Sequence, residues 1–552
     1  MNRRSFLGSC AAAAGAVAAA PLLASCGTSG SSGAGTTSAS QLAKIMPTYV
    51  PRTAIKPDFA SIDGSSPGYL NYPASLVHTV TGVPGDGGSY TAITPLWASI
   101  PSPSGNTYYA SVNRALGATL TMQPANGDNY STILPPLFSG NKVPDWIQIP
   151  SFWTGPLNFG QATTAKLADL TPYLAGDKIK KYPNLAAIFP AAWQAGIWNN
   201  RIYGIPVFAT QFTVGYYLYY RADVLAKLGV GTPKVTSASD LLALGKEINN
   251  PAKKQWAFDD IWGYLYQPFG IPSSWTANAK GDLITPYETE NIIEAMNFEA
   301  KIIKAGLMNP DSIAGDTGTS KQRFWSGQML IMPDGQGAWN YTDAQSGAAA
   351  NKGYVRMAFP FFTTSGSGTP RMPLENGASF ISYLNKSLSP SQIEELLRIA
   401  NYLAAPFGSY EYTLINYGEP DVDYTMGPNG PVLTATGNKQ VASTYSFLAG
   451  PNQVINNPGY PEITRASAVF EQQNARYGYQ PLFYDMNIAV PNNLAAANAY
   501  TPFTETANIM YEVVRGRSTI ADYKSTVQEW QHNGGNELRK FYESVRAKYG
   551  DA

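Results

Sequence analysis

Cysteine and histidine, on which much protein chemistry depends, are almost missing from this chain: its 552 residues contain two of each. Both cysteines, Cys10 and Cys26, lie near the N-terminus, so the rest of the chain can form no internal disulfide and must rely on its core for stability. His78 and His532 have no second histidine or cysteine near them in sequence, as a zinc site would need. The sequence therefore predicts no metal site and no cofactor, and it disfavours catalysis through a histidine base.

Charge is also scarce and evenly divided. The chain has 38 basic and 38 acidic residues, charged residues make up 14% of it, and no block of like charge occurs. Because a nucleic-acid binder needs a basic surface for the phosphates, no nucleic-acid partner is expected. Aromatic residues are abundant instead, at 12%, with 35 Tyr and 11 Trp. A surface of neutral polar groups and amphipathic rings favours a neutral, hydroxyl-rich ligand over an ionic one.

The N-terminus has the three parts of an export signal. Arginines at positions 3 and 4 precede an uncharged, alanine-rich run over 8–20 and the sequence Leu-Ala-Ser-Cys over 23–26. This run is shorter than the ~20 apolar residues that span a bilayer. The paired arginines fit a twin-arginine signal, and the last four residues resemble a bacterial lipobox, whose cysteine is lipidated. We predict a signal peptide over 1–25 and a lipid anchor at Cys26, with cleavage without lipidation as the alternative.

Two segments without a fold of their own follow the signal. Residues 26–40 are nearly all Gly, Ser, Thr and Ala, which predicts a flexible tether. Residues 41–87 contain six prolines and are predicted to form an extended arm along the body. A Gly-x-Ser-x-Gly match at 64–68 lacks the flanking strand and helix of a catalytic nucleophile turn, so we interpret it as a loop. Anchor and tether together predict attachment to the outer face of the bacterial cytoplasmic membrane.

From residue 88 onward, strand and helix patterns alternate. Strands are predicted at 90–96, 118–122 and 143–149, with helices at 108–116 and 130–138 between them. Alternation of this kind indicates a parallel α/β sheet with helices on its faces. Later segments add a strand at 213–220 and helices at 221–229, 240–248, 288–305, 389–404 and, interrupted at Gly534-Gly535, 505–549.

Four stretches carry a resemblance to a known family by their order and spacing. They are Tyr-Arg-Ala-Asp-Val-Leu-Ala-Lys-Leu-Gly over 220–229, the helix end and proline exit at 296–311, Phe-Trp-Ser-Gly over 324–327 with Gly-Ala-Trp at 337–339, and Leu-Glu-Asn-Gly-Ala-Ser over 374–379. Together they resemble the family 1 extracellular solute-binding proteins of ABC importers, the group that includes maltose-binding protein. Residues 417–424, Tyr-Gly-Glu-Pro-Asp-Val-Asp-Tyr, resemble the subgroup of large lipoproteins called LipO-like.

The resemblance implies an α/β protein with a two-lobed, type II periplasmic-binding-protein-like fold, whose lobes close on a ligand in the cleft between them. Lobe 1 is expected at 88–207 plus 372–428, and lobe 2 at 208–371 plus 429–552. The implied function is the extracellular substrate-binding component of an ABC transporter. It would capture a carbohydrate, with an oligosaccharide favoured, and deliver it to the membrane permease subunits. A monomer is expected.

Candidate ligand-binding residues follow from sugar chemistry, because apolar CH faces pack on aromatic rings and hydroxyls bond to Asp, Glu, Asn and Gln. Trp153 follows the third strand, at the sheet edge where ligands bind in open α/β sheets. The crossing after Val207 brings Gln211 towards the same space. Trp262 and Tyr266 lie in a segment that corresponds, by the resemblance, to a sugar-facing stretch of maltose-binding protein. The set is completed by Asp334, Trp339, Glu375 and Asn376, although some of the aromatic residues are expected to pack in the core instead.

Two other classes of function compete with this one. A secreted glycosidase or lyase would act on the same kind of ligand, and carboxylates for two-carboxylate hydrolysis are present. Nothing in the sequence pairs such carboxylates, so no catalytic residue is predicted. A surface scaffold or adhesin is disfavoured because the chain has no internal repeat.

Overall fold

The computed structural model describes residue 37 and residues 39–154, 157, 159–316, 318–484, 486–499 and 509–549. The predicted signal peptide over 1–25, the predicted lipid anchor at Cys26 and most of the tether over 26–40 lie outside these residues. Within the described ranges, no helix is both long enough and apolar enough to cross a membrane.

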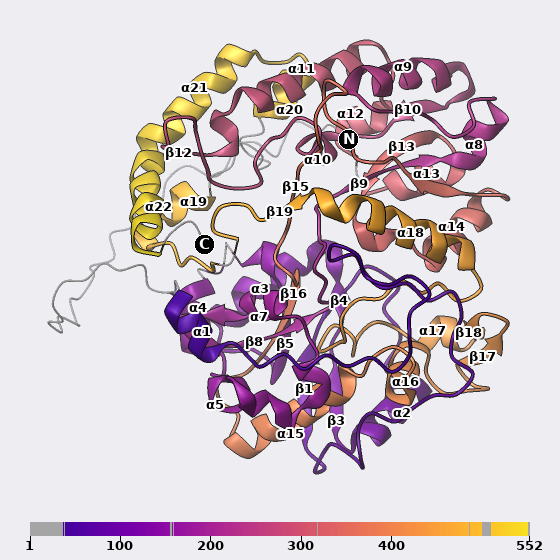
Figure 1. Cartoon of the computed structure of the whole chain (residues 1–552), viewed down its shortest axis with the longest axis vertical. Coiled ribbons are helices and arrows are strands. Elements are labelled where there is room, and N and C mark those ends of the chain that lie inside the picture. Colours follow the sequence, from indigo (N-terminus) through magenta and orange to yellow (C-terminus); the bar gives the residue numbers. More distant parts are fainter. Residues whose placement is uncertain are drawn as a thin grey trace, which may run out of the picture. The chain divides into compact units, whose positions relative to one another are not determined.

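The first lobe is built on a five-stranded sheet with the order β3-β1-β5-β16-β8 (Figure 1). β1 pairs in parallel with β3 and β5, whereas β16 pairs antiparallel with β5 and β8. The sequence predicted a parallel sheet. The sheet is mixed because β16 follows the return from the second lobe and enters in the opposite direction. The strands are β1 (Ser89–Ile93), β3 (Thr119–Met122), β5 (Trp146–Pro150), β8 (Gly204–Val207) and β16 (Phe380–Leu384).

Local signals explain where the helices of the first lobe begin and end. The Asn106 side chain accepts a hydrogen bond from the Tyr109 amide at the start of α2, and the helix ends at Gly117, whose φ of 64° is left-handed. Ser389 and Gln392 form a reciprocal capping box at the start of α15. The predicted helices at 108–116, 130–138 and 389–404 are confirmed as α2 (Thr107–Leu116), α3 (Tyr130–Ser139) and α15 (Pro390–Leu403).

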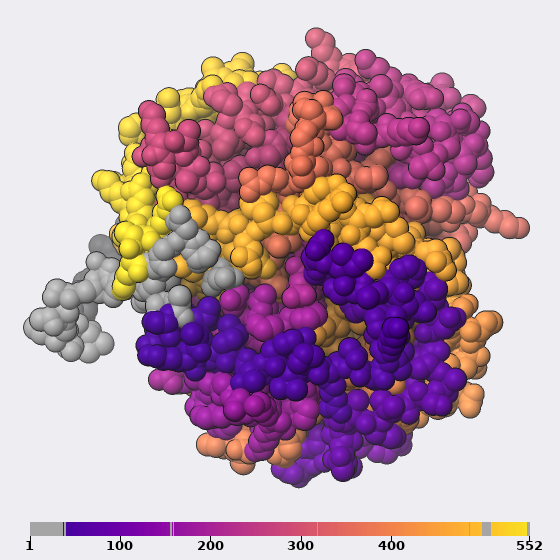
Figure 2. Space-filling model, in the orientation of Figure 1, coloured from indigo at the N-terminus to yellow at the C-terminus, as the bar shows by residue number. Residues whose placement is uncertain are grey.

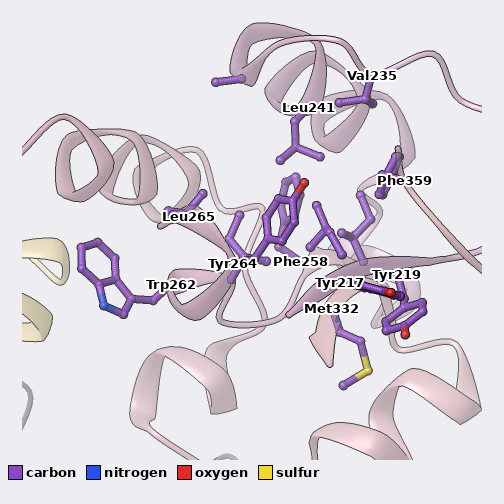
Figure 3. Packing of buried hydrophobic residues seen from close by; sticks show 14 of the residues in the cluster. Tyr217, Tyr219, Val235, Leu241, Phe258, Trp262, Tyr264, Leu265, Met332 and Phe359 are labelled. Carbon is purple, nitrogen blue, oxygen red and sulfur yellow. The ribbon is translucent and has the colours of Figure 1, made fainter. Parts of the chain in front are cut away.

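The second lobe is built on a four-stranded sheet with the order β10-β13-β9-β14, in which β10 and β13 are parallel and the other pairs antiparallel. All five residues of β9 are buried. Figure 3 shows Phe258 of β10 on the same side of the sheet as Leu241 of α9, whereas Tyr219 of β9 lies with Met332 on the other side. The elements are β9 (Tyr217–Arg221), β10 (Trp256–Phe258), β13 (Met329–Asp334), β14 (Arg356–Ala358), α8 (Ala222–Lys227), α9 (Ala238–Ile248) and α11 (Glu290–Lys304).

Helices near the C-terminus pack on the second lobe. Met510 and Tyr523 belong to its hydrophobic core, and a smaller cluster joins Trp275 to Trp530. The helical run is interrupted at Gly534, whose φ is 110°, in agreement with the predicted break at Gly534-Gly535. The helices are α20 (Ile509–Val514), α21 (Ile520–Trp530) and α22 (Asn536–Tyr549).

The chain crosses between the lobes more than once, and its last return lies later than the sequence boundary at 428–429. Tyr445, Leu448 and Ala449 pack in the core of the first lobe. Phe470, in α18 (Pro461–Asn474), packs in the core of the second lobe. The structure therefore places this crossing between residues 449 and 470, because the burial of these side chains decides to which core each segment belongs.

The arm over 41–87 contacts both lobes. After α1 (Ala39–Ile45), its backbone pairing up to residue 87 consists of isolated bridges. The amide of Val50 donates to the Ala186 carbonyl of the first lobe at 2.8 Å, and the amide of Ser66 donates to Glu471 Oε2 of α18 at 2.7 Å. Figure 2 shows the indigo arm running across the first lobe to the orange band that contains α18. The segment 64–68 is a loop, as predicted.

Candidate functional site

Two adjoining hollows form a cleft that is lined by residues of both lobes. The outer hollow has a volume of about 970 Å³ and the inner hollow a volume of about 580 Å³. Four residues line both hollows, so the two adjoin: Gly215, Tyr216, Ser273 and Glu375. The outer hollow is also lined by Trp97, 151–154, Trp198, Ser274, Trp275, Gly335, Leu374, Asn376, 481–484, 486–488 and Tyr542. The inner hollow is completed by Asp259, Asp260, Trp262, Gly263, Tyr266, Gln267, Ser320, Met332, Pro333, Pro373 and Tyr511.

The first-lobe wall of the outer hollow carries exposed aromatic rings. Trp97 follows the short strand β2 (Pro95–Leu96) and is 46% exposed, and Phe152 follows β5 and is 56% exposed. Trp97 stacks on Trp153, with ring centroids 5.9 Å apart and planes 29° apart. A Cβ at Gly127 would lie 2.4 Å from the Trp97 ring, so glycine there makes room for the indole. Large rings left open to water beside a hollow are suited to stacking on a ligand.

Of these rings, sequence reasoning found Trp153 and missed Trp97 and Phe152. Trp153 is partly buried and lies against Tyr130 and Phe152, at centroid distances of 5.8 and 5.0 Å. All three of these cleft rings follow strands of the first lobe, at the edge where α/β sheets bind ligands. Applying that rule to the end of the first strand, as well as the third, would have identified Trp97.

Tyr216 is the exposed ring of the second lobe. It directly precedes β9 and is 44% exposed, whereas the next residue, Tyr217, is buried. The sequence placed this residue only within a predicted strand at 213–220, and the structure makes it a lining residue of both hollows. A Cβ at Gly263 would lie 2.8 Å from this ring, so glycine in α10 (Trp262–Leu265) allows the ring to lie against that helix.

Two predicted aromatic residues line the inner hollow. Trp262 and Tyr266 meet edge to face, with centroids 6.0 Å apart. Trp262 is buried, and Figure 3 shows its ring at the margin of the second-lobe core, apart from Phe258 and Tyr264. The structure therefore brings both residues to the inner hollow, with Trp262 serving as part of its wall rather than as an open ring.

Three carboxylates line the inner hollow. Asp259 is buried and accepts a hydrogen bond from Ser312 Oγ, while Asp260 is partly exposed and accepts one from the Trp262 amide at 2.9 Å. Loss of solvation on burial raises the pKa of Asp260. Glu375 is open to the hollow but surrounded by protein atoms, and the same cause raises the pKa of its carboxyl. These groups are acceptors when ionised, as hydroxyl and ammonium ligands require.

Glu375 and Asn376 lie on the segment by which the chain returns to the first lobe, after β15 (Met372–Pro373). The amide of Glu375 donates to the Thr213 carbonyl at 2.9 Å, which ties this crossing segment to the earlier one. Ser379 Oγ donates to Glu375 Oε2 at 3.3 Å. Both predicted residues line the outer hollow, so the structure brings them together with Trp153.

Three predicted residues lie elsewhere. Trp339 is 6% exposed and packs in the second-lobe core, edge to face with Tyr219 and Phe470. The Asp334 side chain forms an ion pair with Arg356 at 3.2 Å, within the second lobe. Gln211 lines a separate hollow of about 320 Å³ beneath the arm.

A third wall of the outer hollow comes from parts of the chain that the sequence did not connect with the site. Trp275 stacks on Tyr542 of α22, with centroids 5.0 Å apart and planes 30° apart. Phe483 packs against the same tyrosine at 5.5 Å. No sequence signal relates residues 275, 483 and 542, because only tertiary packing brings them together.

The groups around the cleft are suited to binding. The residues that line the two hollows include aromatic rings, hydroxyls, amides and carboxylates, with no His, Cys, Lys or Arg among those the structure describes. Across the described ranges, no group of three or more His, Cys, Asp or Glu residues is arranged to hold a metal ion. Rings can cover apolar faces of a ligand while the polar groups bond to its rim.

Solved structures of solute-binding proteins share this fold. The N-glycan transport solute-binding protein NgtS of Streptococcus pneumoniae is 17% identical with a TM-score of 0.58, and the match covers 83% of this chain and 99% of that one. An extracellular solute-binding protein of Bifidobacterium longum subsp. infantis is 13% identical with a TM-score of 0.60, and the match covers 84% of this chain and 99% of that one. The alginate-binding protein AlgQ2 is 13% identical with a TM-score of 0.59, and the match covers 83% of this chain and 98% of that one. No curated protein sequence matches the chain.

The two-lobed α/β architecture predicted from the sequence is thus confirmed, and the family follows from the sequence itself. The family model described as "Bacterial extracellular solute-binding protein" matches residues 102–387, more than half of the chain. This range runs from just before α2 to just after β16 and includes the strands of the second sheet. The chain belongs to the family of bacterial extracellular solute-binding proteins.

Proposed function

We propose that this protein captures a carbohydrate, in particular an oligosaccharide, and delivers it to the permease of an ABC transporter. The observation that carries the proposal is a cleft in which Trp97, Phe152 and Tyr216 are open to solvent beside Glu375 and Asn376. A sugar has apolar CH faces that stack on rings and hydroxyls that bond to carboxylates and amides. Rings on both lobes allow the lobes to close over the two faces of a sugar chain.

The structural neighbours support the same proposal. NgtS was solved with Man5GlcNAc, FusA of S. pneumoniae with kestose, and MalE3 of T. maritima with maltose. The outer hollow of about 970 Å³ reaches the upper end of the usual range for small-ligand sites, which favours several sugar units over one. We propose binding without turnover, since the family consists of solute-binding proteins.

The binding proposal is tested with a panel of oligosaccharides and the purified protein. A true ligand at about 100 times its Kd adds ~2.7 kcal/mol to the stability of the folded state, so thermal unfolding should shift upwards and saturate. Chromatography of the same mixtures after long incubation should show the sugars unchanged. Absence of a shift with every sugar class would contradict the proposal, and steady product formation would favour the alternative, a glycosidase or lyase.

We further propose that the protein is exported through the twin-arginine signal over 1–25, is lipidated at Cys26, and acts as a monomer of the LipO-like subgroup on the outer face of the cytoplasmic membrane. The support is the residue pattern at 3–26 and at 417–424. Replacing Cys26 by Ala should release the protein into the medium or leave it unprocessed. Processed Cys26→Ala protein that stays in the membrane fraction would contradict the lipid anchor. Replacing both Arg3 and Arg4 by Lys should block export.

A further inference from the structure

The arm leaves the first lobe, reaches α18 of the second lobe and returns to the first (Figure 1). Ahead of this excursion, the amide of Val50 donates to the Ala186 carbonyl at 2.8 Å. Beyond it, the Tyr72 hydroxyl and Thr413 Oγ1 are hydrogen-bonded at 2.7 Å. Ala186 and Leu414, the neighbour of Thr413, both pack in the core of the first lobe. The arm is therefore fixed to the first lobe on both sides of its contact with the second.

Between these anchors, residues 59–69 form a loop that is closed on itself. The amides of Phe59 and Gly68 each donate to the carbonyl of the other, at 3.0 and 2.9 Å. A Cβ at Gly68 would lie 2.9 Å from the Cβ of Ala468, so glycine there lets the loop lie directly on α18. The guanidinium carbon of Arg465, also in α18, lies 5.6 Å from the centroid of the Phe59 ring. The loop is thus packed against one helix of the second lobe.

Two hydrogen bonds strengthen this contact. The amide of Ser66 donates to the buried Glu471 carboxylate at 2.7 Å, and Gln472 Nε2 donates to the Ala60 carbonyl at 2.7 Å. Both acceptor and donor side chains belong to α18, which moves with the second lobe because Phe470 packs in its core. The anchors and the loop therefore join the two lobes outside the crossing segments.

The loop also contacts two of the segments by which the chain crosses between the lobes. Ser66 Oγ and Thr210 Oγ1, in the crossing after β8, lie 3.5 Å apart. The amide of Tyr69 donates to the Ile455 carbonyl, in the last crossing, at 2.8 Å. Crossing segments are the parts of the backbone that change conformation when two lobes close. The loop consequently packs on the hinge itself.

The loop and the cleft lie on different sides of this hinge. Gly215 and Tyr216, further along the same crossing as Thr210, line both hollows. Among the described residues, none of the arm and none of α18 lines either hollow. A rotation that narrows a gap on one side of a hinge widens the other side. Closure of the cleft therefore carries α18 away from the loop, whose anchors stay with the first lobe.

We propose that residues 59–69 brace the hinge: docked on α18, they hold the cleft open and oppose its closure on a ligand. The docked loop occurs here together with an open cleft, in which Trp97 is 46% and Tyr216 is 44% exposed. Closure has to break the contacts of the loop with α18. Because contacts made only in the open arrangement lower the population of closed protein, the brace lowers the apparent affinity for ligand.

The double variant Arg465→Ala/Gln472→Ala removes two of the docking contacts. These residues are seven positions apart, on one face of α18, and neither is buried. Hydrogen exchange measured by mass spectrometry should show the amides of 59–69 exchanging at least about tenfold faster, which corresponds to ~1.4 kcal/mol. Gln472→Ala alone, a smaller change, should accelerate exchange less. Thermal unfolding shows that each variant is folded.

Small-angle X-ray scattering of the purified, ligand-free protein then measures the arrangement of the lobes. The double variant should have a smaller radius of gyration than the unchanged protein, because its lobes close more often. The control Gln473→Ala/Arg476→Ala removes the same two types of side chain further along the chain, where Arg476 donates to the Tyr477 hydroxyl. It should change neither the exchange of the loop nor the radius of gyration.

Two outcomes would overturn the proposal. A released loop with an unchanged or larger radius of gyration would show that the loop does not hold the lobes apart. Unchanged exchange over 59–69 in the folded double variant would show that these contacts do not hold the loop. No sugar is used in either measurement, so failure of every oligosaccharide in the binding panel would contradict carbohydrate capture and leave the brace standing.

Discussion

The two lobes contribute different chemistry to the same cleft. The first lobe presents open rings, Trp97 and Phe152, and its residues around the outer hollow carry no charge apart from Glu375 on the crossing segment. The second lobe buries most of its aromatic residues, such as Tyr217 and Trp339, and presents carboxylates to the inner hollow.

The difference implies that the two lobes contribute in different ways to ligand binding. Stacking on rings depends little on which sugar is bound, because most pyranoses have an apolar face. Charge discriminates strongly, because placing a like charge or an unpaired charge in a hollow is unfavourable. We therefore expect the first lobe to supply general affinity and the second lobe to supply selectivity.

The largest effect should come from the buried ring of the second lobe. Trp339→Ala removes a side chain packed between Tyr219 and Phe470, so we expect a loss of ~3–5 kcal/mol in the free energy of unfolding. Denaturant titration measures it, and Trp339→Phe should lose less because a ring remains. A Trp339→Ala variant with full stability and lost sugar binding would place Trp339 in the cleft. That result would contradict the difference between open rings in the first lobe and buried rings in the second.

The next effect should come from the open ring of the first lobe. Trp97→Ala should weaken sugar binding by ~1–3 kcal/mol, since the exposed indole loses its contact area with the ligand. Stability should change little because much of the ring is already in water. Tyr410→Ala, an exposed ring on α16 (Tyr410–Tyr417) away from both hollows, serves as the control and should leave affinity unchanged. Equal losses of sugar affinity in Trp97→Ala and Tyr410→Ala would show that the effect does not come from the cleft.

The last effect concerns a second-lobe carboxylate outside the cleft. Burial raises the pKa of Glu471 from 4.5 to about 7, although hydrogen bonds from the Ser66 amide and from Gln336 oppose the shift. The folded state thus holds this proton more tightly than the unfolded state. Its contribution to stability is complete below pH 4.5 and is lost as the pH rises through about 7.

Melting temperatures measured across this range should therefore fall as the pH rises. For the Glu471→Gln variant they should fall less steeply, because a glutamine side chain does not titrate. The control Glu529→Gln, at an exposed position of α21, should keep the slope of the unchanged protein. A Glu471→Gln variant with the same slope would show that Glu471 does not titrate in this range, and that the junction of the arm with α18 is not pH-sensitive.

Much of the fold was predictable because its signals are local. Asn106 and Gly117 delimit α2, and Ser389 with Gln392 starts α15, each through contacts with residues a few positions away. The candidate site was predictable only in part. Trp153, Trp262, Tyr266, Glu375 and Asn376 line the hollows, while Trp339 is core, Asp334 is paired with Arg356 and Gln211 lies beneath the arm.

The sequence by itself determined the family and the order of the α/β elements, because caps, turns and hydrophobic periodicity act over short distances. Its composition, with few charges and many aromatic residues, favoured a neutral ligand. Only the tertiary structure decided which rings stay open, since Trp97 needs Gly127 beside it and Tyr216 needs Gly263. It also decided where charge gathers: Asp260 and Glu375, which are 115 positions apart, meet at one hollow. Both the exposure of these rings and the meeting of these carboxylates depend on packing between distant segments, which short-range sequence patterns do not predict.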